Sequence, residues 1–163
     1  MMKTLVVYYS LTGATRKVAR ELARVLKADL DEIESTTSYA GLWGYFRGGR
    51  DSWRGHLAPI EPAGVAPGDY DLVVVGGPVW AGHAAPPLRR YIQDHKPEFK
   101  KVGFFFTEGG SPPKRAFAEL ESLVGQKPVA TMAILNRTVA QNDFENEVAD
   151  FAGPIRMKEE AVF

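Results

Sequence analysis

The amino-acid sequence predicts an α/β fold in which a parallel sheet carries helices on both faces. Four short runs, at residues 4–9, 71–77, 101–107 and 128–135, are apolar at successive positions, as in strands that are buried on both faces. Stretches with helical periodicity separate these runs, and this alternation is typical of right-handed βαβ units. The length of 163 residues suits one well-buried core, so we expect a single domain over residues 1–163.

The remaining elements follow from local patterns. Helices are expected at residues 15–27, 86–94, 113–124 and 141–151, where apolar positions recur at helical spacing or prolines suit a first turn. Residues 28–34 alternate weakly and are expected to form an edge strand. Residues 35–68, rich in glycine and proline, are interpreted as an insertion with some helix.

Composition excludes several classes of function. Lysine plus arginine and aspartate plus glutamate both number 20, which removes the net charge that drives binding to nucleic acid or anionic lipid. The absence of cysteine excludes thiolate chemistry, disulfides and cysteine-ligated metals, so redox chemistry would need a bound cofactor. No signal-peptide pattern or long apolar segment occurs, and we expect a cytoplasmic protein with no membrane insertion, no nucleic-acid partner and no metal.

Ligands of such sheets bind at the carboxyl ends of the strands, which directs attention to three loops. The first loop consists of Ser10, Leu11, Thr12, Gly13, Ala14 and Thr15. The first N–H groups of the following helix lack intrahelical acceptors and favour an anion, while Gly13 permits close approach and the hydroxyls add donors. This pattern predicts a phosphate-binding loop; the alternative is that Ser10 or Thr12 only caps the helix. The loop has neither the G-x-G-x-x-G nor the G-x-x-x-x-G-K-[ST] pattern.

The run YYSLTGATRKVARELA resembles the phosphate-binding signature of flavodoxins, Ser/Thr-x-Thr-Gly-x-Thr after the first strand. Ser10, Thr12, Gly13 and Thr15 match its fixed positions. The resemblance covers nearly the whole chain in element order. It implies a three-layer flavodoxin-like fold, a five-stranded parallel sheet of order 2-1-3-4-5, and flavin mononucleotide (FMN) as cofactor.

Two further stretches are similar to the loops that hold the flavin ring in this family. VVVGGPVWAGHAAPPLRRYI carries the Gly-[Ser/Gly/Thr]-Pro-x-[Trp/Tyr] pattern, and FFFTEGGS lies where the family has a glycine-rich loop. The residues expected at the ring are Pro78, Val79, Trp80, Ala81, Gly82 and His83 from the first stretch, and Thr107, Glu108, Gly109 and Gly110 from the second. Trp80 is expected in an exposed loop where it can stack on the ring; the alternative is a core aromatic on the next helix.

Two ionisable residues and the insertion leave alternatives open. His83 is a candidate catalytic proton donor to the flavin, against the alternative of a polar surface residue. Glu108 is expected to be a solvated loop carboxylate. In residues 41–55, GLWGYFRGGRDSWRG, aromatic residues alternate with arginines. They could cover the core, form a lid or homodimer contact near the flavin, or, least consistent with the balanced charge, bind nucleic acid.

Three functions are compatible with this sequence. The first is an FMN-dependent electron-transfer protein that acts on a redox partner protein. The second is a flavin-dependent NAD(P)H:quinone or small-acceptor oxidoreductase, which the balanced charge favours because electron carriers of this family tend to be acidic. The third is a non-redox module with a degenerate site, which the complete phosphate-binding pattern disfavours.

Overall fold

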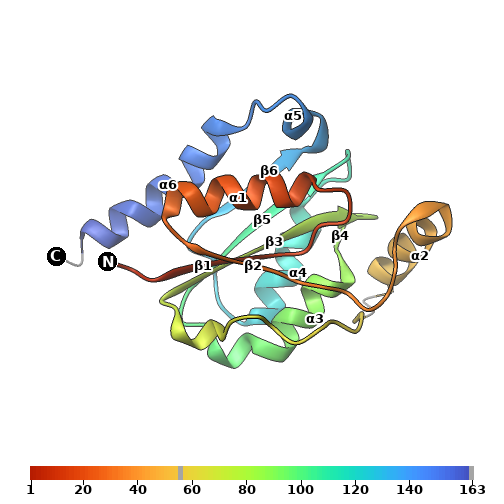
Figure 1. Ribbon diagram of the computed structural model, residues 1–163, viewed down its shortest axis with the longest axis horizontal. Helices are drawn as coiled ribbons and strands as arrows, with labels where there is room; N and C mark the ends of the chain where they lie inside the picture. Colours follow the sequence, from red (N-terminus) through yellow and green to blue (C-terminus); the bar gives the residue numbers. More distant parts are fainter. Residues whose placement is uncertain (55–56, 162–163) are drawn as a thin grey trace.

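A computed structural model describes residues 1–54 and 57–161 (Figure 1). Its strands are β1 (Thr4–Tyr8), β2 (Asp29–Glu32), β3 (Leu72–Trp80), β4 (His83–Ala84), β5 (Val102–Glu108) and β6 (Thr131–Leu135). Its helices are α1 (Ala14–Leu26), α2 (Gly41–Trp53), α3 (Pro86–His95), α4 (Lys114–Val124), α5 (Asn136–Ala140) and α6 (Glu145–Glu160). Two short 3₁₀ turns, Pro67–Asp69 and Lys96–Glu98, precede β3 and β5.

The sheet has the predicted parallel arrangement. Its order is β2-β1-β3-β5-β6, and all four neighbouring pairs are parallel. Counted along the chain without β4, these five strands have the order 2-1-3-4-5, so the expected fold class is confirmed. The strand β4, which was not predicted, adds a sixth, antiparallel member beside the end of β3.

The end of β3 differs from the sequence prediction. The predicted strand stops at Gly77, whereas β3 continues to Trp80 and turns through Ala81 and Gly82 into β4. Both turn residues have positive φ, 52° and 79°, as in the two-residue turn that suits the twist of a hairpin. The segment interpreted as a loop is therefore a short β-hairpin. The sequence prediction ended the strand too early because Gly76, Gly77 and Pro78 are residue types that usually occur in loops.

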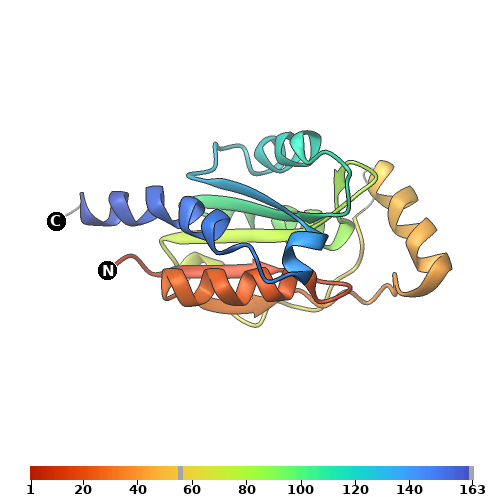
Figure 2. The same cartoon turned by 90° about the horizontal axis from the view of Figure 1, so that it is seen from above.

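Helices cover both faces of the sheet, as Figures 1 and 2 show. Side chains of β1 and of Tyr9, which follows it, alternate between two cores. Leu5, Val7 and Tyr9 enter the core that α3 and α4 cover, while Val6 and Tyr8 enter the core beneath α1 and α6. β1, β3 and β5 are buried almost throughout, as expected for strands covered on both faces. The site at their carboxyl ends thus stands on a rigid frame.

The chain after β6 also departs from the prediction. A helix was expected at residues 141–151; the structure has the short α5 before this segment and the longer α6, which begins at Glu145. Asn142 has a positive φ of 56° and separates the two helices. Pro154 lies inside α6, although proline usually interrupts a helix, and this explains why the sequence pattern placed the end too early.

The two termini lie at one end of the molecule and α2 at the other, beside the carboxyl ends of the strands (Figure 1). The helix expected within the insertion at residues 35–68 is α2, and the described segments 35–40 and 57–66 beside it contain no helix or named strand. No helix within residues 1–54 and 57–161 has both the length and the apolar character needed to cross a membrane.

Candidate functional site

The three predicted loop segments meet at the carboxyl ends of β1, β3 and β5. Thr15 Oγ1 and Thr107 Oγ1 are 2.7 Å apart in a buried hydrogen bond that joins the first segment to the third. The rings of Tyr9 and Trp80, with centroids 5.9 Å apart, join the end of β1 to the second segment. The sequence motifs, up to 92 residues apart, therefore form one surface.

The first segment has the geometry of an anion cradle. Gly13 adopts φ 98°, a conformation that favours glycine, and directs the chain into α1. Ser10 Oγ accepts hydrogen bonds from the N–H groups of Gly13, at 3.1 Å, and Arg16, at 3.3 Å. Two backbone donors at the start of α1 thus converge on one oxygen, which is the capping contact that the sequence left open for Ser10; a phosphate would have to take these donors from Ser10 Oγ.

The side chains of this cradle differ in exposure. Leu11 and Thr12 are exposed, Ser10 is half-buried and Thr15 is buried, while Ala14 is the first residue of α1. Thr12 can therefore reach a ligand directly. The Thr15 hydroxyl already bonds to Thr107 and holds the cradle against β5.

The nearest cation to the cradle is engaged elsewhere. Arg16 forms a two-point ion pair with Glu32, with distances of 2.6 and 3.2 Å, and the Tyr8 hydroxyl donates to the same carboxylate. Burial and the hydrogen bond to Glu32 raise the pKa of Tyr8. Arg16 Nη1 lies 3.6 Å from the position of a Cβ atom at Gly13, so the paired guanidinium borders the cradle.

A groove of about 680 Å³ begins beside the cradle and runs along the outer face of α1. Its lining includes Gly13, Arg20 and Arg24 from the α1 side and Asn142 from the turn before α6. Arg24 is paired with Glu21 at 2.6 Å. The groove lies outside the predicted ring-binding segments.

Trp80 is half-buried at the end of β3 and is not in an exposed loop as predicted. Its ring packs edge-on against Tyr9 and, with centroids 5.1 Å apart, at a tilt against Tyr39. Burial raises the pKa of Tyr9 to about 12. Aromatic surface is therefore concentrated at the predicted ring position, but part of it is already in contact with the protein.

His83 is buried, with 9% of its surface exposed, which contradicts the interpretation as a polar surface residue. Its Nδ1 hydrogen bonds to the Glu119 carboxylate on α4, and the other Glu119 oxygen accepts from the N–H of Ala84 at 3.3 Å. Arg115 Nη1 lies 3.5 Å from Nε2. The catalytic role of His83 stays a prediction, and its imidazole is fixed between β4 and α4.

The third segment contains an unexpected buried carboxylate oxygen. Glu108 was expected to be solvated, but it is the last residue of β5, and its Oε2 is buried without a hydrogen-bond partner among the described residues. Gly109 and Gly110 are exposed, and Gly110 has φ 126°. A buried acceptor of this kind is costly unless a donor reaches it.

Helix α2 packs over the second segment through its glycines. A Cβ atom at Gly48 would lie 2.9 Å from Cε3 of Trp80, and one at Gly44 would lie 2.1 Å from the backbone of Tyr39. Only residues without a side chain permit so close an approach. The helix thus contacts the predicted ring position, in agreement with a lid near the flavin.

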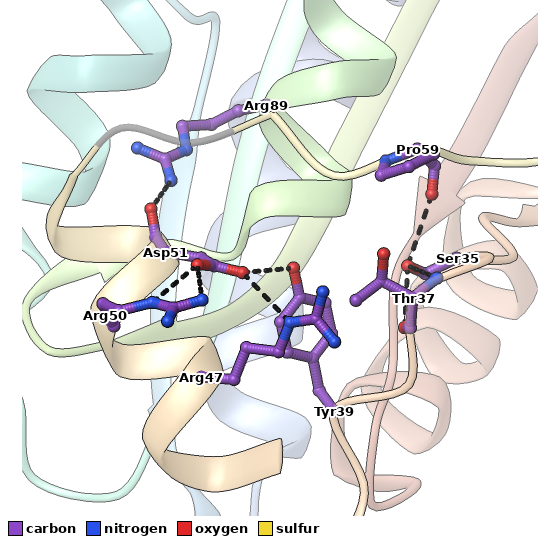
Figure 3. A network of polar contacts seen from close by, with 8 residues as sticks. All are labelled: Ser35, Thr37, Tyr39, Arg47, Arg50, Asp51, Pro59 and Arg89. Atoms are coloured by element: carbon purple, nitrogen blue, oxygen red, sulfur yellow. Dashed lines mark hydrogen bonds and ion pairs between the residues drawn. The ribbon is translucent and has the colours of Figure 1, made fainter. Parts of the chain in front are cut away.

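A polar network holds α2 in this position (Figure 3). The buried Asp51 side chain accepts a hydrogen bond from the Tyr39 hydroxyl at 3.2 Å and two from Arg50, at 3.1 and 3.2 Å. Arg47 lies 3.8 Å from the same carboxylate. Arg89 of α3 donates to the Asp51 backbone oxygen at 3.1 Å. Burial raises the pKa of Tyr39 and lowers that of Arg89.

A family model described as Flavodoxin matches residues 3–151. The chain belongs to the flavodoxin family.

Solved structures similar to this flavodoxin-family chain are flavoproteins. A Lactobacillus acidophilus NCFM flavoprotein in complex with FMN is 24% identical with a TM-score of 0.70, covering 86% of this chain and 98% of that one. A putative flavoprotein of Bacteroides eggerthii DSM 20697 is 23% identical with a TM-score of 0.70, covering 90% and 98%. Oxidised flavodoxin 2 of Bacillus cereus is 18% identical with a TM-score of 0.60, covering 96% and 99%. No curated protein matches the chain.

Several residues around the candidate site were missed by sequence reasoning. They are Tyr39, Asp51, Arg89, Arg115 and Glu119. Each belongs to a helix or an extended segment and acts through a partner far along the chain: Glu119 lies 36 residues from His83, and Arg89 lies 38 from Asp51. Residues this far apart in the sequence form no local motif from which such pairs could be predicted.

We expect Asp51→Asn to loosen α2 in this flavodoxin-family chain. The amide keeps the size of the side chain but loses the charge that attracts Arg47 and Arg50. The loss of charge-assisted hydrogen bonds predicts about tenfold faster hydrogen exchange across α2. Asp94→Asn is the matched control, since its pair with Arg90 is an exposed contact at 2.9 Å on another helix. Equal exchange in α2 of both variants would contradict the role of Asp51.

Proposed function

We propose that this chain binds FMN at the carboxyl ends of β1, β3 and β5 and uses it for electron transfer. The observation that carries the proposal is that the start of α1, with Gly13 at φ 98° and an exposed Thr12, lies at the carboxyl end of β1 and is joined to the end of β5 by the Thr15–Thr107 hydrogen bond. Membership of the flavodoxin family and the FMN complex of the Lactobacillus relative support the same ligand.

The phosphate of FMN is assigned to the first segment. Its members are Ser10, Leu11, Thr12, Gly13, Ala14 and Thr15. Backbone N–H groups and the Thr12 hydroxyl would donate to the phosphate, and the helix dipole of α1 would add a favourable field. Arg16 borders this set but is paired with Glu32 at 2.6 Å, so we assign it no hydrogen bond to the phosphate.

The flavin ring is assigned to the hairpin and to the end of β5. The residues are Pro78, Val79, Trp80, Ala81, Gly82 and His83, with Thr107, Glu108, Gly109 and Gly110. Trp80 would supply aromatic surface, and Glu108 Oε2, buried without a partner among the described residues, is suited to accept an N–H from the polar edge of the ring. When bound, FMN supplies one- or two-electron redox chemistry.

A reductase of quinones or other small acceptors is the second candidate. The equal numbers of acidic and basic residues favour it, because a dedicated carrier gains from a strong net charge that steers it to its partner.

The first test is to reconstitute the purified protein with FMN and titrate it with dithionite under anaerobic conditions. We expect FMN to bind with a stoichiometry of about one, and visible absorption to pass through two resolved one-electron steps. A single two-electron step would favour the reductase, and the next assay would be NAD(P)H oxidation with quinones. Failure to bind FMN would reject the proposal.

A further inference from the structure

The outer face of α2 presents an apolar stripe to solvent. Trp43, Phe46 and Trp53 are 85%, 60% and 69% exposed. Their spacing of three and seven residues places them on one side of the helix, opposite Gly44 and Gly48, which face Tyr39 and Trp80. These aromatic residues do not cover the core, which was one interpretation of this segment.

The charge around this stripe is positive. Arg47, Arg50 and Arg54 are exposed. Asp51 is the one carboxylate of the helix sequence; its buried side chain accepts from Tyr39 and pairs with Arg47 and Arg50, which leaves a net positive charge on the helix (Figure 3). The balance of charge over the whole chain, which disfavours an anionic lipid partner, therefore does not hold for this face. The combination of tryptophan, phenylalanine and arginine is typical of helices that lie at a membrane interface.

The position and size of the face favour a bilayer over a protein. Both views place α2 at the end of the molecule opposite the termini, where it protrudes (Figures 1 and 2). A helix of 13 residues is about 20 Å long, and its outer strip covers on the order of 200 Å². A stable protein interface takes about 800 Å² from each partner. A second copy would also bring like-charged arginines together, which is unfavourable.

We propose that the outer face of α2 binds the surface of an anionic phospholipid bilayer. The three aromatic side chains enter the headgroup region, and the arginines contact lipid phosphates. Because α2 rests on Trp80 through Gly48, binding in this orientation turns the predicted ring position toward the membrane surface. The inference is independent of the proposed redox function and is tested without turnover.

The test uses vesicles of phosphatidylcholine alone and of phosphatidylcholine with 30% phosphatidylglycerol. We expect co-sedimentation with the anionic vesicles only, weakened by salt, and a blue shift of tryptophan emission. Of the three tryptophans, Trp80 is half-buried and serves as an internal reference. With Trp43→Ser, Phe46→Ser and Trp53→Ser combined, vesicle affinity should fall at least about tenfold and the emission of Trp80 should not shift.

Single variants separate charge from a general surface effect. Arg54→Gln should lower vesicle affinity about fivefold and Arg54→Lys should retain it, because each basic residue contributes roughly equally near an anionic surface. Met157→Ser is the matched control: Met157 is 71% exposed on α6, near the opposite end of the molecule. Circular dichroism checks that each variant folds.

Three outcomes would overturn the proposal. Equal binding to neutral and anionic vesicles, or binding to neither, would exclude an anionic bilayer as the occupant. Concentration-dependent dimerisation that the triple variant abolishes would assign the face to a second copy. Binding of an added acidic redox protein, such as rubredoxin, in place of vesicles would assign the face to a protein partner.

Discussion

We expect Gly76→Ala to lower the free energy of unfolding by about 3 kcal/mol, at the upper end of the usual cost of overpacking a core. A Cβ atom at this position would lie 2.0 Å from Cε1 of Phe105. Gly76 and Phe105 are register partners in β3 and β5, and the Phe105 ring is fully buried. Neither strand can move away, because β1 and β6 flank them in the sheet. Urea unfolding of the cofactor-free protein measures the loss.

Gly103→Ala is the matched control for this substitution. Gly103 also lies in a central strand, but a Cβ there would be 3.2 Å from the tip of the Phe151 side chain on α6, which can shift. Both variants gain the same reduction in unfolded-state entropy, so their difference isolates the clash. If Gly76→Ala were no less stable than Gly103→Ala, the close packing of β3 on β5 would be wrong.

The second large effect is expected at the phosphate cradle. Replacing Thr12 and Thr15 together by alanine should weaken FMN binding about 100-fold, since the hydrogen bond that Thr12 would make to the charged phosphate is worth roughly 1.5–3 kcal/mol and Thr15 fixes the cradle through Thr107. Fluorescence titration of FMN gives the dissociation constant. The proposal on phosphate binding fails if the affinity is unchanged.

Leu11→Ala is the control for the cradle. Leu11 is exposed in the same loop, and only its backbone can serve a phosphate, so FMN affinity should stay within a few-fold of the original protein. Because Thr15 is buried against Thr107, the unfolding free energy of the double variant must be measured as well. That measurement separates a loss of affinity from a loss of fold.

Sequence alone predicted the frame of this structure and the location of its loops. The runs at β1, β3 and β5 carry an unambiguous signal, because strands covered on both faces are apolar at every position. The first loop was found because a hydroxyl-rich and glycine-containing turn before an amphipathic helix has a local physical meaning. These features depend on neighbours in the chain.

The features that were missed depend on distant contacts. The burial of His83 results from Glu119 on α4, and the conformation of Trp80 depends on Tyr39 and on Gly48 of α2. The continuation of β3 beyond Gly77 requires the β5 neighbour, which pairs with it as far as Pro78. The periodicity of apolar residues gives no information about these contacts, because it depends only on spacing along the sequence.

The two ends of the candidate site differ in how ready they are for a nucleotide. The cradle at α1 is already ordered by Ser10 and by the hydrogen bond between Thr15 and Thr107. The loop would therefore lose little conformational entropy when a phosphate binds. At the other end, Tyr39 and Gly48 already contact Trp80, and a ring could reach the covered part of that surface only after α2 moves. Cofactor capture would then have a direction: the phosphate anchors first, and the slower displacement of the helix admits the ring.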